Sequence, residues 1–93
     1  MMESSVTAPE NVLLVDDDAD ILFILAETLS AAGFSVRTCG SGEEACDALH
    51  SSAFGVLIVD QNMPGMKGVE LLERAAELQS WCGRILLSGM SVS

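Results

Sequence analysis

Short apolar runs alternate with longer segments of helical periodicity along this chain. The run Val12–Val15 is apolar throughout and is ended by polar residues, which is typical of a strand buried on both faces. From Asp18 or Ala19 to Ala32, apolar residues recur at helical spacing. The alternation continues with predicted strands at Phe34–Cys39, Phe54–Val59 and Arg84–Leu87, and with predicted helices from Ser41 to about His50 and from Gly68 to Gln79. This order predicts an α/β fold, a doubly wound parallel sheet with helices on both faces.

Two predicted strands and the first helix carry more detailed expectations. The segment Phe34–Cys39 mixes apolar residues with polar ones, which indicates a strand at the edge of the sheet. The segment Phe54–Val59 is strongly apolar and is ended by Asp60, which indicates a central strand. In the first helix, one apolar stripe should face the sheet: Ile21, Leu22, Leu25, Leu29 and Ala32.

The composition excludes several classes of protein. Fourteen acidic and four basic residues give a net charge of −10, so the phosphate backbone of a nucleic acid would be repelled. The longest apolar run, Ile21–Ala26, is far shorter than the ~20 residues that cross a bilayer. Three cysteines without C-x-x-C spacing argue against a disulfide framework or a zinc site. We expect a cytoplasmic protein that binds neither nucleic acid nor membrane.

The ends of the predicted strands carry the candidate chemistry. Asp16, Asp17 and Asp18 follow the first strand, Asp60 follows the third, and Ser88 follows the fourth. In open parallel sheets, ligands bind beyond the carboxyl ends of the strands, so these loops should meet in one cleft. Clustered carboxylates repel one another and need a cation, and Mg²⁺ prefers oxygen ligands. Asp60 is placed to attack a phosphoryl group beside that metal.

Simpler roles are open for several of these residues. Aspartates before a helix are commonly N-caps, and Asp18 or Asp20 is expected to be only that. A lone aspartate at the end of a strand is more often a solvated turn residue than a nucleophile. Only its expected position beside the other loops favours Asp60 as a nucleophile. His50, the one histidine, lies at a helix end and is given no functional role.

Three stretches resemble the receiver domain of bacterial two-component response regulators. They are VLLVDDD at 12–18, VLIVDQNMPGMKG at 56–68 and RILLSG at 84–89. The resemblance covers residues 11–89. It implies the flavodoxin-like fold of the chemotaxis regulators, with residues 1–11 as a flexible leader and 12–93 as the receiver domain.

The resemblance also implies roles for individual residues. Asp60 would be the phospho-acceptor, taking a phosphoryl group from the phosphohistidine of a sensor histidine kinase. Asp17, Asp60 and the backbone carbonyl of Asn62 would bind Mg²⁺, with Asp16 supporting the metal through water. Ser88 would be the switch hydroxyl that turns toward the aspartyl phosphate, and Pro64 and Gly65 would shape the loop after the acceptor. Such a module accepts phosphate stoichiometrically and is not expected to be an enzyme.

The sequence departs from the family pattern at its C-terminal end. The family continues with a helix, a strand ending in a lysine and a last helix, whereas this sequence stops at Ser93. The expected fold is therefore a shortened one of about four strands and three helices. The one lysine, Lys67, stands where the family usually has an acidic residue, and it is not expected to replace the missing one. Without the last helix, Ile85, Leu86 and Leu87 would lie on a free apolar edge, which favours self-association.

Two other functions remain open at this stage. The chain would be a dimerising interaction domain of receiver fold, with an impaired or absent phospho-switch, if the missing elements and their lysine are essential. The other alternative is that the chain is a phosphohydrolase of the haloacid dehalogenase type. Members of that family also have an aspartate directly after a buried strand. That family has a second aspartate two positions on, where this sequence has Asn62.

Overall fold

The computed structural model describes residues 11–61, 63, 65–79 and 83–87. Strands and helices alternate as the sequence predicts. The elements are β1 (Asn11–Val15), α1 (Ala19–Ala31), β2 (Ser35–Cys39), α2 (Gly42–Ser51), β3 (Val56–Asp60), α3 (Gly68–Leu78) and β4 (Gly83–Leu87). The expectation of four strands and three helices is thus confirmed for the described part of the chain. None of these helices is both long enough and apolar enough to span a bilayer.

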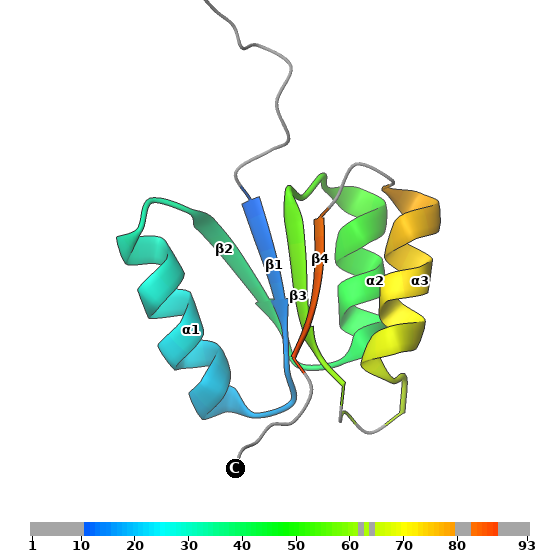
Figure 1. Ribbon diagram of the computed structural model, residues 1–93, viewed down its shortest axis with the longest axis horizontal. Helices are drawn as coiled ribbons and strands as arrows, with labels where there is room; N and C mark the ends of the chain where they lie inside the picture. Colours follow the sequence, from blue (N-terminus) through cyan, green and yellow to red (C-terminus); the bar gives the residue numbers. More distant parts are fainter. Residues whose placement is uncertain (1–10, 62, 64, 80–82, 88–93) are drawn as a thin grey trace, which may run out of the picture.

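The four strands form one parallel sheet in the order β2-β1-β3-β4. The predicted edge position of β2 and the central position of β3 are therefore confirmed. α1 lies on one face of the sheet, and α2 and α3 lie side by side on the other (Figure 1). This is the three-layer arrangement that parallel strands joined by helices are expected to give.

The hydrophobic core occupies the face of the sheet that α2 and α3 cover. We call this the packed face. It is built from alternate residues of the strands, such as Leu13, Leu57 and Val59, against Ala45 of α2 and Leu71 of α3. All five side chains are completely buried. Because successive strand residues point to opposite faces, their neighbours Leu14 and Ile58 belong to the other face.

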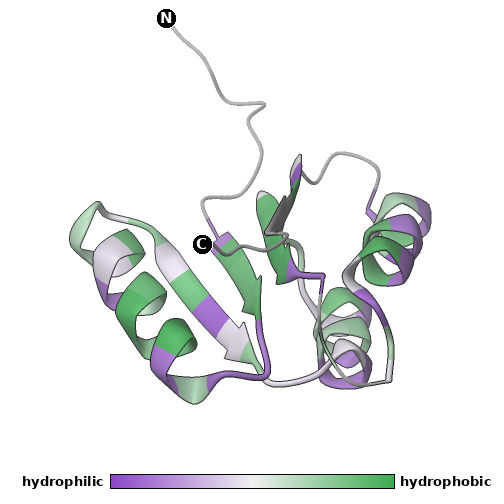
Figure 2. Cartoon of the chain, turned by 60° about the horizontal axis from the view of Figure 1, so that its bottom comes forward, coloured by the Kyte–Doolittle hydropathy of each residue, from purple (hydrophilic) through white to green (hydrophobic). Residues whose placement is uncertain are grey.

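The face under α1 is packed less completely, and we call it the open face. Among the described elements, α1 contacts β1 and β2 but neither β3 nor β4. A hollow of about 320 Å³ lies between α1 and Thr38 of β2, where Leu22 and Ala26 form part of its wall. Figure 2 shows that α1 is rich in apolar residues, yet it holds no fully buried side chain.

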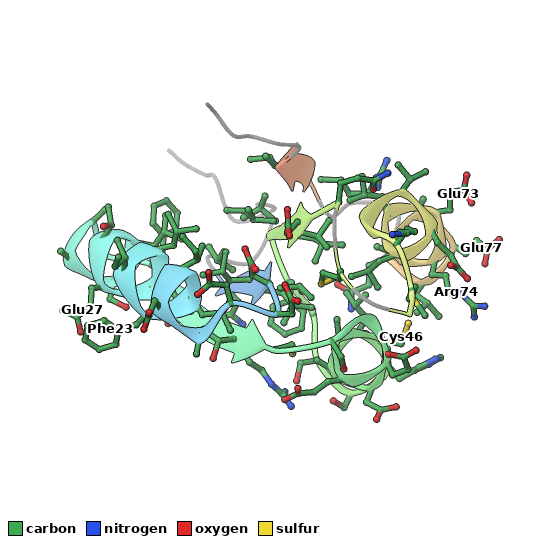
Figure 3. The ribbon with its side chains drawn as sticks, turned by 90° about the horizontal axis from the view of Figure 1, so that it is seen from below. Phe23, Glu27, Cys46, Glu73, Arg74 and Glu77 are labelled. Atoms are coloured by element: carbon green, nitrogen blue, oxygen red, sulfur yellow. The ribbon has the colours of Figure 1, made fainter. Side chains whose placement is uncertain are left out.

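The predicted apolar stripe of α1 is therefore only partly correct. Its members Leu22, Leu25 and Leu29 are half-buried, whereas Ile21 and Ala32 are exposed. Exposed apolar residues continue around the helix, with Ile24 at 58% and Phe23 at 66% exposed. Figure 3 shows Phe23 and its helical neighbour Glu27 pointing away from the sheet. Periodicity locates the side of a helix that faces the sheet, but not how deeply the helix is buried.

Local hydrogen bonds explain where the elements begin and end. Asp18 caps α1 by accepting from the backbone N–H groups of Asp20 and Ile21, so its expected role as an N-cap is confirmed. Ser41 caps α2 by accepting from the N–H of Glu44, three residues further along the chain. α1 ends before Gly33, whose φ of 101° is the left-handed conformation that glycine adopts most easily.

Five strand boundaries differ from the prediction by one or two residues. β2 begins at Ser35 rather than Phe34, β3 ends at Asp60 rather than Val59, and β4 begins at Gly83 rather than Arg84. β1 begins at Asn11, which pairs with Ser35, rather than at Val12. β3 begins at Val56 rather than Phe54, because the N–H of Phe54 is bound by the side chain of Gln79 instead of a neighbouring strand. Apolar character alone cannot reveal such a competing hydrogen bond.

Candidate functional site

The candidate site lies at the carboxyl ends of β1 and β3. Val15 of β1 is level with Val59 of β3 in the parallel register. The residues that follow, Asp16 and Asp60, therefore leave the sheet side by side. Asp17 is next along the chain after Asp16. The predicted meeting of the first and third strand ends is thus found in the structure.

Three carboxylates gather at this place. Asp16, Asp17 and Asp60 each offer one oxygen, and these three oxygens lie within 4.8 Å of one another. Asp16 is buried, Asp60 is half-buried and Asp17 is exposed. The cluster is thus anchored in the protein on one side and open to solvent on the other.

The surroundings of Asp16 work against its negative charge. Burial is the largest cause that raises the pKa of Asp16, and the nearby carboxylates of Asp60, Asp17 and Asp18 raise it further. The N–H of Asp18 donates to Oδ1 of Asp16 at 2.9 Å, which partly offsets the rise by stabilising the charged form. Clustered carboxylates in such a setting suit a cation, because the cation removes both the repulsion and the cost of burial.

The donor set fits a hard divalent cation. Carboxylate oxygens are the ligands that Mg²⁺ prefers, and Mg²⁺ commonly binds a few protein carboxylates and keeps several waters. The open side of the cluster leaves room for such waters. No histidine or cysteine belongs to the cluster in the described part of the chain, so a softer metal has less to bind here.

The other predicted site residues are distributed as follows. Asn62, Pro64 and Ser88 lie outside the described residues. Lys67 is exposed and immediately precedes α3. His50 is exposed in the last turn of α2. Gly65 is exposed in the loop after Asp60, with a φ of 79°.

Sequence reasoning overlooked Gln61, which directly follows Asp60. Its side-chain oxygen Oε1 accepts a hydrogen bond of 2.9 Å from the N–H of Val69, in the first turn of α3. The residue before α3, Lys67, makes no side-chain capping bond of its own. The absence of Ser, Thr, Asp or Asn just before Gly68 was the signal that another residue must serve this helix end.

The fold and the acidic cluster agree with comparisons to known proteins. Residues 12–93 match the response regulator receiver domain family. The C4-dicarboxylate transport transcriptional regulatory protein DctD of Rhizobium meliloti is 36% identical over 83 residues, which cover 89% of this chain and 18% of DctD. The virulence sensor protein BvgS of Bordetella bronchiseptica is 42% identical over 86 residues, covering 88% of this chain and 7% of BvgS. This chain therefore spans a small part of both relatives.

A solved structure supports the same assignment. The crystal structure of the response regulator protein TrrA from Thermotoga maritima, in complex with Mg(2+)-BeF, is 32% identical with a TM-score of 0.81. The match covers 87% of this chain and 70% of TrrA. Both the extent of the family match and the shared parallel sheet lead to one conclusion. This chain belongs to the response regulator receiver domain family of two-component signal transduction.

Proposed function

We propose that this chain is a phospho-accepting module in which Asp60 takes a phosphoryl group from a sensor histidine kinase. The observation that carries the proposal is the convergence of Asp16, Asp17 and Asp60 at one end of the sheet of a receiver-family member. Asp60 is half-buried, so a carboxylate oxygen remains accessible to a donor while the strand holds it in place. A positioned carboxylate of this kind can act as a nucleophile toward phosphorus.

The proposed transfer is a displacement at phosphorus. A carboxylate oxygen of Asp60 forms the new O–P bond while the P–N bond to the imidazole of the kinase breaks. The electron pair of the broken bond stays on the ring nitrogen, which takes up a proton from water. Each event consumes one Asp60 carboxylate and converts it to an acyl phosphate, so the chain acts as a stoichiometric acceptor rather than as an enzyme.

We propose that the acidic cluster holds Mg²⁺ during this transfer. Asp17 and Asp60 would be ligands together with the backbone carbonyl of Asn62, and Asp16 would act through a water molecule. When bound, the ion would neutralise the carboxylates and the charge on the transferred phosphoryl oxygens. The burial of Asp16 supports this role, because a buried carboxylate is held in a fixed direction. Ser88 is the proposed hydroxyl that contacts the phosphoryl group.

The experiment is phosphorylation of the full chain by acetyl phosphate with Mg²⁺, followed by intact mass. We expect one added phosphoryl group, lost in Asp60→Asn and lost when the divalent ion is chelated. Asp18→Asn is the matched control: Asp18 lies beside the cluster but caps α1, and asparagine is an equally good N-cap. Phosphorylation that persists in Asp60→Asn would disprove the assignment of the acceptor.

A second proposal concerns the open face, through which we propose that two copies of the chain associate. Ile24 of α1 is 58% exposed and Ile85 of β4 is 48% exposed, and Ile85 is level with the half-buried Ile58 of β3. The chain has a net charge of −10, so the charged surfaces of two copies repel each other. Contact through the apolar surface around Ile24 and Ile85 avoids most of this electrostatic repulsion. A two-fold arrangement would place α1 of each copy over β3 and β4 of the other, the two strands that α1 of the same copy does not contact.

Sedimentation velocity tests this association directly. We expect a concentration-dependent dimer for the unmodified chain and a monomer for the double variant Ile24→Ser, Ile85→Ser. Leu78→Ser is the control, because Leu78 is an exposed apolar residue on α3, on the opposite side of the sheet. A dimer that survives the double variant, or a chain that stays monomeric at high micromolar concentration, would contradict the proposal.

A further inference from the structure

Gln61 joins the end of β3 to the beginning of α3. Its Oε1 accepts a hydrogen bond from the N–H of Val69 at 2.9 Å, and its backbone oxygen accepts a longer one of 3.4 Å from the N–H of Gly68. These two N–H groups belong to the first turn of α3, whose amides have no partner within the helix. A single residue, adjacent to Asp60, thus closes the loop that connects β3 with α3.

The interior of the same loop is anchored elsewhere. Met63 is 1% exposed and belongs to the hydrophobic core. Met66 packs against Gly42 at the start of α2, so closely that a Cβ on Gly42 would lie 2.8 Å from the Cβ of Met66. The loop is therefore held at its middle by the core and by α2, and at its base by Gln61. Asp60 lies at that base, between the sheet and the closed loop.

The neutral side chain of Gln61 matters at this position. A carboxylate would cap a helix N-terminus at least as well, because it also interacts with the helix dipole. It would, however, add a negative charge on the residue that directly follows Asp60, one of three aspartates whose carboxylate oxygens already lie within 4.8 Å of one another. The amide oxygen of glutamine supplies the acceptor without that charge.

We propose that Gln61 is a positioning residue for the acidic cluster: its hydrogen bond to α3 fixes the end of β3 and thereby holds Asp60 against Asp16 and Asp17. The inference rests on the proposed function, because it concerns the same divalent-ion site. Without the bond, only the longer backbone hydrogen bond from Gly68 would join the end of β3 directly to the first turn of α3, and the two would move more freely relative to each other. Ion binding would then have to restore the order that Gln61 supplies in advance.

The test compares Gln61→Ala with Gln61→Glu, which keeps an acceptor at the same reach. Asn11→Ala is the control, because it also removes one hydrogen bond between a side-chain amide and the backbone, here from Nδ2 to the carbonyl oxygen of Ala53, at the opposite end of the sheet. Three quantities are measured on the full chain: hydrogen exchange of the Val69 amide by NMR, the Kd for Mg²⁺ alone, and the rate of phosphorylation by acetyl phosphate across a range of Mg²⁺ concentrations. If Gln61→Ala does not fold, Gln61→Met replaces it.

We expect Gln61→Ala to lose protection at the Val69 amide and to bind Mg²⁺ about tenfold more weakly. Its phosphorylation rate should recover at saturating Mg²⁺, since the reacting groups are intact. The variant should therefore need more Mg²⁺ for half of the maximal rate, while the maximal rate itself stays unchanged. Gln61→Glu should restore protection at Val69 and bind Mg²⁺ at least as tightly as the unmodified chain. Asn11→Ala should leave all three quantities unchanged.

Two results would overturn the inference in distinguishable ways. If Gln61→Ala loses protection at Val69 yet binds Mg²⁺ with unchanged affinity, the cap is real but does not position the site, and only this inference is wrong. If the unmodified chain binds no Mg²⁺ and accepts no phosphate, the proposed function is wrong and the role of Gln61 is wrong with it.

Discussion

The two faces of the sheet are built from the same strands but are buried to different degrees. On the packed face, strand residues such as Leu57 and Val59 meet α2 and α3, and their side chains are completely buried. On the open face, α1 reaches only β1 and β2 among the described elements. It covers Val12 and Leu14 of β1 completely, but none of its own side chains is fully buried. Because stabilisation by burial grows with the apolar area removed from water, the packed face should carry most of the stability.

The largest difference is expected between two neighbouring residues of β3. Leu57→Ala removes a fully buried side chain from the packed face and should cost about 3 kcal/mol. Ile58→Ala removes a half-buried side chain from the open face and should cost about 1 kcal/mol. Urea unfolding of the two variants gives the comparison. Equal losses would show that the open face is covered in solution.

A polar residue also stabilises the packed side. Gln79 is 4% exposed; its Oε1 accepts from the N–H of Phe54, and its Nε2 donates to the carbonyl oxygens of Leu49 and Ser52. Gln79→Ala leaves these backbone groups without their partner and should cost about 2 kcal/mol. Thr28→Ala, which removes one exposed hydrogen bond on α1, should cost less than about 0.5 kcal/mol. Thermal unfolding distinguishes the two, and a similar loss in both would count against this asymmetry.

At the acidic end of the sheet, unlike in the core, replacing a buried residue should stabilise the protein. Folding raises the pKa of Asp16, so the folded state binds a proton at this residue more tightly than the unfolded state does. The resulting stabilisation is complete below the ordinary pKa of about 3.9 and is lost as the pH rises through the raised pKa. At neutral pH without divalent ions, Asp16→Asn should therefore be more stable than the unmodified chain, and this gain should vanish in acid.

Urea unfolding at pH 7 and at pH 3.5 measures this effect. Mg²⁺ should stabilise the unmodified chain more than Asp16→Asn. Asp20→Asn is the control, since Asp20 is exposed in the first turn of α1 and is not part of the carboxylate cluster. A neutral-pH loss of stability in Asp16→Asn would show that its charge is compensated in the free protein.

The smallest effect concerns two thiols on the packed side. Burial raises the pKa of Cys39 to about 11, and it also raises the pKa of Cys46, which the neighbouring Arg74 partly lowers. Cys39 is 1% exposed and Cys46 is half-buried. Alkylation at pH 8, followed by peptide mass analysis, should modify Cys46 faster by about tenfold or more, because Cys39 reacts only when the structure opens. Equal rates would mean that β2 opens readily at the sheet edge.

The sequence was sufficient for the order of elements and for the place of the acidic cluster. Both follow from short-range patterns: apolar runs that end in aspartate, and a parallel sheet that brings Asp16 and Asp60 to one end. It was not sufficient for Gln61 and Gln79, whose side chains find hydrogen-bond partners eight or more residues away. It also could not show that Ile21 lies outside the buried stripe, because burial depends on which elements α1 contacts.

The level pairing of Val15 with Val59 has one more consequence. Side chains in a strand point alternately up and down, so a one-residue insertion within β3 would turn Asp60 to the other side of the sheet and away from Asp16. Even if the helices and hydrophobic layers repacked around such a change, the carboxylates would no longer meet. The proposed phosphate acceptance is thus more sensitive to strand length than folding is.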